Sequence, residues 1–175
     1  EKKDLARLVT GMFIVTPFAL ILLAQASSDV YRYSVSILSL SLLVLVGAGI
    51  RYKGRLNPLI IFSVGGLGGL TGGLTGIPGP PVILLYVASS HPISVIRANN
   101  LLFLYFFDVC VVLFFLFTGV LTLKLVLLGS LLAVPNFLGN FLGAKFFNPQ
   151  KTNQYRLFAY IIIATAAISG LPVWD

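Results

Sequence analysis

The residues best suited to bind a ligand lie in one stretch of glycine and proline, GGLGGLTGGLTGIPGPP, at residues 65–81. Pro78, Pro80 and Pro81 remove backbone donors and clash with any helix that continues through them. The chain around them is otherwise apolar, so the segment is expected to be a helix that breaks and starts again. Such a break is expensive inside a membrane, where each unpaired polar group costs several kcal/mol. A helix that only had to pack would not contain it.

The break frees polar backbone groups on both sides. Carbonyl groups lose their partners after about Thr75, and N–H groups are predicted to be free at Gly79, Val82 and Ile83. The start of a helix carries positive partial charge, so an anion fits there without a buried Lys or Arg. We therefore predict a site for an anion or polar substrate at the break. A purely structural hairpin and a cation site at the carbonyl end are the alternatives.

The glycines before the break have a simpler explanation. They recur every four residues, which gives a helix smooth faces for close neighbours. The two rows are Gly65, Gly69 and Gly73, and Gly68, Gly72 and Gly76. A phosphate-binding P-loop is excluded because the Gly-Lys-Ser/Thr ending is missing.

Polar side chains inside the apolar runs are the second group of candidates. Asp108 is the only acidic residue within a predicted span, and such residues usually have a function. It either takes up a proton when the substrate anion moves or accepts structural hydrogen bonds. Asparagines near the ends and middle of spans either contact the ligand or join helices. The full predicted binding set is Thr75, Gly76, Gly79, Val82, Ile83, Asn99, Asn100, Asn136 and Asn140.

Enzymatic chemistry finds no support in the sequence. There is no HExxH or G-x-S-x-G motif, and no second intramembrane acid is available to pair with Asp108. Cys110 is the single cysteine and lies in an apolar run, which indicates a small buried residue rather than a metal ligand or disulfide. No metal and no cofactor are expected.

The composition indicates which elements must hold these residues. Hydrophobic residues make up 58% of the 175 and charged residues only 10%, against about a quarter charged in soluble domains. The twelve Lys and Arg form short clusters between apolar runs, which is typical of membrane loops and not of a nucleic-acid surface. The chain is therefore predicted to be an all-α polytopic membrane protein embedded in the lipid bilayer. Because it opens at Glu1 without a start methionine, we interpret it as a fragment or trimmed product.

Six apolar runs define the predicted helices. Residues 59–90 form a run of 32, against roughly 20 for one crossing and roughly 40 for two. This length predicts two half-helices that meet near residues 76–80, with Asn57 and His91 on the same side of the membrane. The five predicted transmembrane helices are residues 8–26, 34–50, 99–120, 121–144 and 155–171.

Charge counting favours a re-entrant hairpin for the broken run. We place the amino-terminal cluster and RYKGR in the cytoplasm, following the positive-inside rule. If the broken run crosses fully, seven cations lie inside and five outside. If it returns to the same side, only Arg32 and Lys124 lie outside, and ten lie inside: Lys2, Lys3, Arg7, Arg51, Lys53, Arg55, Arg97, Lys145, Lys151 and Arg156.

A weak internal repeat points to the same architecture. A helix interrupted by proline and followed by a Tyr-Arg pair occurs twice, at Pro17 with Tyr31 and Arg32, and at Pro135 with Tyr155 and Arg156. With the hairpin topology the two copies are inverted, as in many secondary transporters with discontinuous helices. We therefore predict an inverted-repeat transporter. Residues 1–57 would hold the last two helices of a first repeat and residues 58–175 a second repeat.

Two segments, GGLTGIPGPPVILLYVASS and VIRANNLLFLYFF, resemble the TauE/SafE-like sulfite exporter family. The matching positions are residues 73–81 and 97–100. The resemblance covers residues 58–171, with the two preceding helices similar to the end of the family's first half. The break here reads Ile-Pro-Gly-Pro instead of the commoner run of glycines, and the first half's own break is absent.

The resemblance implies a function. We expect a multi-pass protein of the cell (inner) membrane that exports a small anion such as sulfite, an organosulfonate or a related carboxylate, with proton coupling through Asp108 as an option. The alternative is a channel-like or structural membrane subunit without a specific solute. No nucleic-acid partner is expected, and the oligomeric state is left open.

Overall fold

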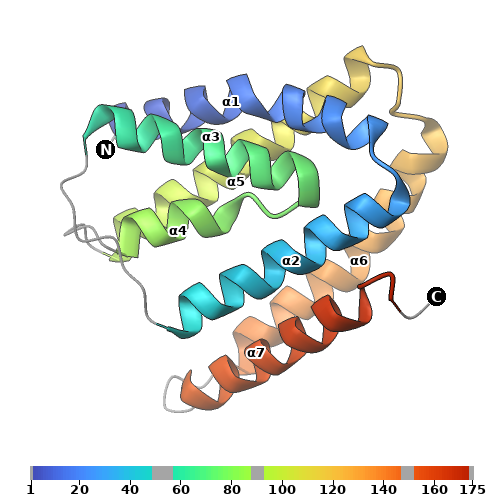
Figure 1. The fold of residues 1–175 in the computed structure, drawn as a ribbon. Helices are drawn as coiled ribbons and strands as arrows, with labels where there is room; N and C mark the ends of the chain where they lie inside the picture. Colours follow the sequence, from blue (N-terminus) through green and yellow to red (C-terminus); the bar gives the residue numbers. More distant parts are fainter. Residues whose placement is uncertain (1, 49–56, 88–92, 147–151, 174–175) are drawn as a thin grey trace.

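The computed structural model describes residues 2–48, 57–87, 93–146 and 152–173. These residues form seven α-helices and no strand (Figure 1). The helices are α1 (Lys2–Gln25), α2 (Ser28–Gly47), α3 (Pro58–Thr75), α4 (Gly79–Val87), α5 (Ile93–Phe117), α6 (Leu123–Phe146) and α7 (Thr152–Ser169). The predicted all-α class is confirmed.

Four of the described helices are long and apolar enough to cross a membrane: α1, α3, α5 over Ser94–Phe117 and α6 over Leu123–Gly143. The protein is therefore a multi-pass membrane protein. The predicted set of five crossings is not confirmed. Helices α2 and α7, which cover two of the predicted crossings, are not among these four, whereas α3, which was predicted to be a half-helix, is among them. Helix α7 contains a shorter apolar stretch, Tyr160–Ser169.

Helix α2 begins earlier than predicted. The polar stretch SSDVYRY was expected to be a loop before residue 34, but α1 ends at Gln25 and α2 begins at Ser28. The Ser27 hydroxyl accepts a hydrogen bond from the Val30 N–H at 3.4 Å, and Asp29 lies in the first turn. Both features favour the start of a helix. Arg32 is consequently a helical residue.

Glycines bring α1 and α3 into direct contact. A Cβ added to Gly65 would overlap the backbone of Leu8, and one added to Gly69 would lie 2.8 Å from the carbonyl oxygen of Met12. Further along, a Cβ on Gly73 would lie 2.5 Å from the Cβ of Ala19. Residues later in α3 contact residues later in α1, which shows that the two helices run parallel. The predicted packing role of this glycine row is confirmed.

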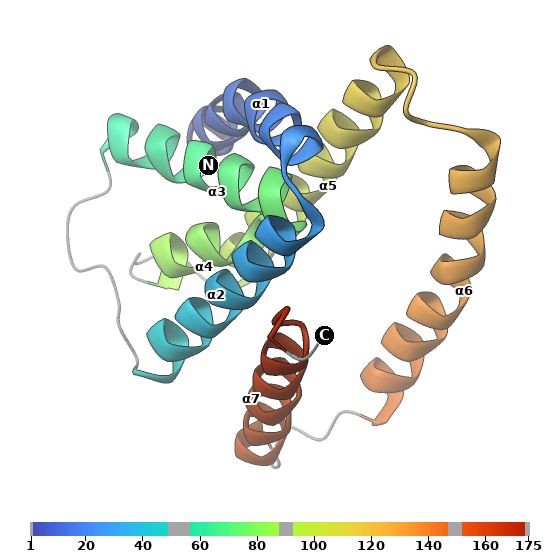
Figure 2. The ribbon, with the colours of Figure 1, turned by 45° about the vertical axis from the view of Figure 1, so that its right-hand side comes forward.

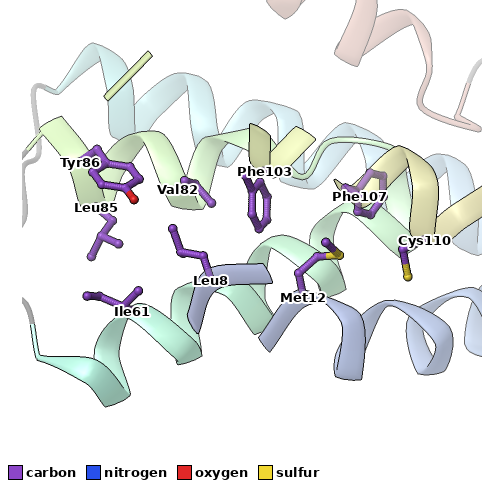
Figure 3. Packing of buried hydrophobic residues seen from close by; sticks show 9 residues of the cluster. All are labelled: Leu8, Met12, Ile61, Val82, Leu85, Tyr86, Phe103, Phe107 and Cys110. Carbon is purple, nitrogen blue, oxygen red and sulfur yellow. The ribbon is translucent and has the colours of Figure 1, made fainter. Parts of the chain in front are cut away.

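The second glycine row receives aromatic rings from α5. A Cβ on Gly68 would lie 2.8 Å from Phe103 Cζ, and one on Gly72 would lie 2.5 Å from Phe107 Cε2. Helix α5 therefore also runs parallel to α3. The buried core combines α1, α3, α4 and α5 (Figure 3). It consists of Leu8, Met12, Ile61, Val82, Leu85, Tyr86, Phe103, Phe107 and Cys110.

The remaining helices lie outside this core. Helix α2 packs against both α3 and α7. Figure 2 shows α6 standing apart from the other helices, and no residue of its apolar span is buried. The core of α1, α3, α4 and α5 is thus the part of the protein that holds the break in place.

Candidate functional site

The chain breaks where the prolines predicted it. Helix α3 ends at Thr75, and Gly76 caps it in the left-handed conformation with φ 75°. The Gly76 N–H donates to the carbonyl oxygen of Gly72 at 2.7 Å. Glycine adopts this conformation without the steric cost that a Cβ would bring. Helix α4 then begins at Gly79.

The two helices at the break differ in length. Helix α3 has 18 residues and α4 has nine, which correspond to about 27 Å and 14 Å. Only α4 therefore has the length of a half-helix, whereas α3 can cross a bilayer alone. Helix α3 begins where the Asn57 side chain accepts a hydrogen bond from the Ile60 N–H at 2.8 Å and Pro58 opens the helix.

Helix α4 runs back along α3. Its last turn meets the beginning of α5, where Asn99 Nδ2 donates to the Tyr86 hydroxyl at 3.1 Å. Its first residue, Gly79, lies beside Leu104, since an added Cβ would be 3.7 Å from Leu104 Cδ2. Helix α4 is therefore antiparallel to α5 and to α3, as Figure 1 also shows. The chain returns to the end of the bundle at which α3 begins; His91 lies outside the described residues.

The amino terminus of α4 lies near the middle of the bundle. Leu104 is close to the midpoint of α5, which spans Ile93–Phe117. Positions 78, 80 and 81 are prolines, so Gly79 is the one residue in the first turn of α4 with an N–H group. Val82 and Ile83 lie farther into the helix, where N–H groups pair with carbonyls four residues back. Helix geometry therefore favours Gly79 as the backbone donor, and the roles of Val82 and Ile83 stay predictions.

A cavity of about 660 Å³ opens beside the break. This is the size of a typical small-molecule site. Its walls come from α2, from the break with α4, and from α7. The break contributes Ile77, Pro80, Ile83 and Leu84, and the polar residues from the other walls include Tyr31, Arg32, Ser36, Ser39 and Tyr160.

Arg32 joins two walls of this cavity. Its Nε donates to the carbonyl oxygen of Gly170 at 3.1 Å, and its Nη2 lies 3.5 Å from that of Leu171. Both carbonyls follow the end of α7, where partial negative charge accumulates. Arg32 is the one charged side chain lining the cavity among the described residues.

Comparison with known protein families shows which family the chain belongs to. The family described as "Sulfite exporter TauE/SafE" matches residues 1–170. The chain belongs to the TauE/SafE family. The match includes α1 and α2 and so extends beyond the residues that carry the resemblance in the sequence. No curated protein and no solved structure matches the chain.

The break and the cavity beside it bring together some of the predicted binding residues. Gly76 and Gly79 lie at the break, and Ile83 lines the cavity. Thr75 is buried, and its hydroxyl donates to the carbonyl oxygen of Thr71 at 2.7 Å. The Val82 side chain faces the core instead of the cavity (Figure 3).

Two predicted asparagines lie beside the core on α5. Asn99 is buried and pairs with Tyr86, which attaches α4 to α5. Asn100 has a buried Oδ1 with no hydrogen-bond partner among the described residues. Neither lines the cavity.

The other predicted residues are not brought to the break. Asn136 and Asn140 are exposed on α6, where Asn140 Nδ2 donates to the Asn136 Oδ1 at 2.6 Å and to its carbonyl oxygen at 3.0 Å. Asp108 is exposed on α5 and does not line the cavity. Their roles in transport stay predictions.

The cavity residues of α2 were not among the residues predicted from the sequence. Tyr31 and Arg32 precede the predicted helix of residues 34–50 and were not expected to line a site. A signal was present, because Arg32, Ser36, Ser39 and Leu43 follow helical spacing and share one face. The same Tyr-Arg pair also marks the internal repeat.

Proposed function

We propose that this TauE/SafE protein is a secondary transporter that exports a small anion across the inner cell membrane. Sulfite, an organosulfonate or a related carboxylate is the proposed substrate class. The observation that carries the proposal is a helix break beside a 660 Å³ cavity in a chain of this family. The anion would reach the break through the cavity.

The amino terminus of α4 supports an anion at the break. Gly79 is buried at mid-depth beside Leu104 and presents the N–H of the first turn. Each contact with a helix terminus contributes about 0.3–2 kcal/mol. Contacts of this size give micromolar or weaker binding. Such binding suits a carrier, which must release what it binds.

We propose the other predicted residues as further contacts during the transport cycle. Thr75, Gly76, Val82, Ile83, Asn99 and Asn100 lie on the helices that form or flank the break. Asn136 and Asn140 would join them when α6 moves toward the core, and Asp108 would couple transport to protons. Rocking of one helix group against another is the usual basis of alternating access.

We also propose a re-entrant α3–α4 hairpin between inverted repeats. Three features support it: the ten-to-two charge distribution, the return of the chain to the end where α3 begins, and the prolines inside α1 and α6, Pro17 and Pro135. In this arrangement α1 and α2, within residues 1–57, correspond to α6 and α7. Helices α2 and α7, the second members of each pair, pack against each other.

Transport assays with the full chain in proteoliposomes test the function. We expect efflux or uptake of sulfite or a sulfonate to saturate with concentration. The rival function, a channel-like or structural subunit, predicts a rate that rises linearly through the low millimolar range or no flux above that of empty liposomes. Either result would remove the carrier proposal.

A further inference from the structure

The cavity beside the break is long, and its charged side chain, Arg32, lies at one end. Its α2 wall runs from Tyr31 to Leu43, a distance of about 18 Å along the helix. Tyr31, Arg32 and Ser36 lie at one end of this wall, and Leu42 and Leu43 lie at the other.

Apolar side chains form most of the remaining lining. Helix α7 contributes Ile163, Ala166 and Ala167 together with Tyr160, which precedes them in the helix, and the break contributes Ile77, Pro80, Ile83 and Leu84. Helix α7 runs opposite to α2, since Gly170 at its end lies against Arg32 and Ser36. The end of the cavity that holds Arg32 is therefore the end at which α7 finishes.

The charge of the lining favours a ligand with one negative charge. Arg32 is the charged residue in the lining, which contains no Asp or Glu among the residues that the structure describes. A guanidinium group binds planar carboxylates and similar oxyanions through paired hydrogen bonds. A single guanidinium in an apolar cavity matches a monoanion better than a dianion, whose second charge would be left without a partner.

The size of the cavity favours a ligand with an apolar body. An inorganic oxyanion with four heavy atoms takes roughly the space of two water molecules, about 60 Å³. The cavity is about 660 Å³. A bare oxyanion would leave the apolar lining in contact with water, whereas a hydrocarbon body would cover it.

We propose that this cavity binds a water-soluble amphiphilic monoanion, with its sulfonate or carboxylate headgroup on Arg32 and its hydrocarbon body along α2 and α7 toward Leu43. The inference rests on the proposed function, because it names the kind of anion that the transporter selects. It adds a binding site on α2 and α7, which the break alone does not provide.

The headgroup can reach Arg32 without dismantling the contact between α2 and α7. The Nε bond to Gly170 is well formed at 3.1 Å, whereas the Nη2 contact with Leu171 is 3.5 Å long. A contact at that distance is at the limit of a hydrogen bond. A headgroup oxygen can replace it while the Nε bond keeps the guanidinium in place.

Calorimetric titration of the full chain in phosphatidylcholine nanodiscs tests the site. The probes are ethane-1-sulfonate, butane-1-sulfonate and octane-1-sulfonate, with sulfite as the inorganic comparison. We expect affinity to rise about fourfold for each methylene that the cavity buries. Affinity that does not depend on chain length, or sulfite binding as tight as that of octane-1-sulfonate, overturns the proposal.

Four variants, one of them a control, locate the bound probe. Arg32→Gln is expected to weaken octane-1-sulfonate binding about tenfold or more, and Arg32→Lys to restore part of it. Ala166→Phe fills the apolar part and is expected to weaken the long probe more than the short one. Lys124→Gln removes an exposed cation on α6 and should change nothing. If Arg32→Gln does not fold, Ala166→Phe decides, and an unchanged preference for the long probe in that variant rejects the site.

Two further measurements are needed. The first distinguishes a water-soluble ligand from a bound lipid, and the second distinguishes failure of this inference from failure of the proposed function. Nanodiscs with phosphatidylglycerol test for an anionic lipid in the cavity, and loss of sulfonate binding there rejects the water-soluble ligand. Saturable sulfite transport without Arg32-dependent octane-1-sulfonate binding keeps the proposed function and rejects this inference. Arg32-dependent binding without saturable transport of any anion supports this site and rejects the proposed function.

Discussion

Arg32 on α2 donates from Nε to the carbonyl oxygen of Gly170, 3.1 Å away and 138 residues later in the chain. The hydroxyl of Ser36, one turn along α2, lies 3.3 Å from the position that a Cβ on Gly170 would occupy. A small residue at 170 therefore lets the end of α7 approach α2. This approach closes one side of the cavity beside the break.

Replacing Gly170 by leucine should separate the end of α7 from α2. The added side chain meets the hydroxyl of Ser36 and the carbonyl oxygen of Ala166, 3.2 Å from the Cβ position. We expect a destabilisation of about 1–3 kcal/mol, measured as a lower melting temperature in nanodiscs. Gly129→Leu is the matched control, because Gly129 on α6 has no atom within 4 Å. Equal melting temperatures for the two variants would contradict the packing described.

The contact between α1 and α3 predicts opposite effects of one substitution at two glycines. Gly69→Ala places a Cβ 2.8 Å from both the Met12 carbonyl oxygen and Thr16 Oγ1, so the helices must move apart. We expect the free energy of unfolding to fall by about 1–3 kcal/mol and the yield of folded protein to be reduced. Gly143→Ala on α6 has open space and should be neutral or stabilising, because alanine favours helices by about 1 kcal/mol. Thermal unfolding of both purified variants is the measurement, and a stable Gly69→Ala protein would count against this close helix contact.

Gly79→Val should reduce anion transport without unfolding the protein. The branched side chain covers the N–H of the first turn of α4, where the anion is proposed to bind. The fold should tolerate it, because a Cβ at this position is 3.7 Å from Leu104 and 4.0 Å from Ile83. We expect about tenfold slower transport in proteoliposomes. Gly47→Val, at the end of α2 with no atom within 4 Å, is the control. Normal transport by Gly79→Val would show that the anion does not use this helix end.

Asp108→Asn should remove the pH dependence of transport and leave the rate at a fixed pH largely unchanged. The side chain is exposed on α5 and does not line the cavity, so its loss should not alter substrate binding. Initial rates measured across a series of pH gradients test this. A variant that still responds to pH as the parent does would place proton coupling on another residue.

The hairpin topology can be tested by labelling single cysteines. In a Cys110→Ala background, Asn57→Cys and His91→Cys should react with a membrane-impermeant maleimide from the same side of sealed vesicles. Lys124→Cys, at the start of α6, should react from the opposite side. If the cysteines at 57 and 91 react from opposite sides, α3 and α4 together cross the membrane.

Local chemistry explains why the break was predictable. Three prolines within four positions cannot continue a helix, and Gly76 supplies the left-handed cap that ends α3. The glycine rows were predictable for a similar reason, because spacing of four places residues on one helix face whatever packs there. The helix lengths follow as well, since a run of residues 59–90 broken near residues 76–80 leaves about 17 and 10 residues, against 18 and nine in the structure.

The sequence by itself determined the membrane class, the family, the position of the break and the glycine faces that pack around it. These properties depend on composition and on residues within a few turns of each other. Only the tertiary structure decided that Arg32 lines a cavity with Ile77 and Gly170, and that Asn136 and Asn140 lie away from the break. Contacts between residues so far apart in sequence arise when packing selects which helix faces meet, and no local pattern specifies that choice.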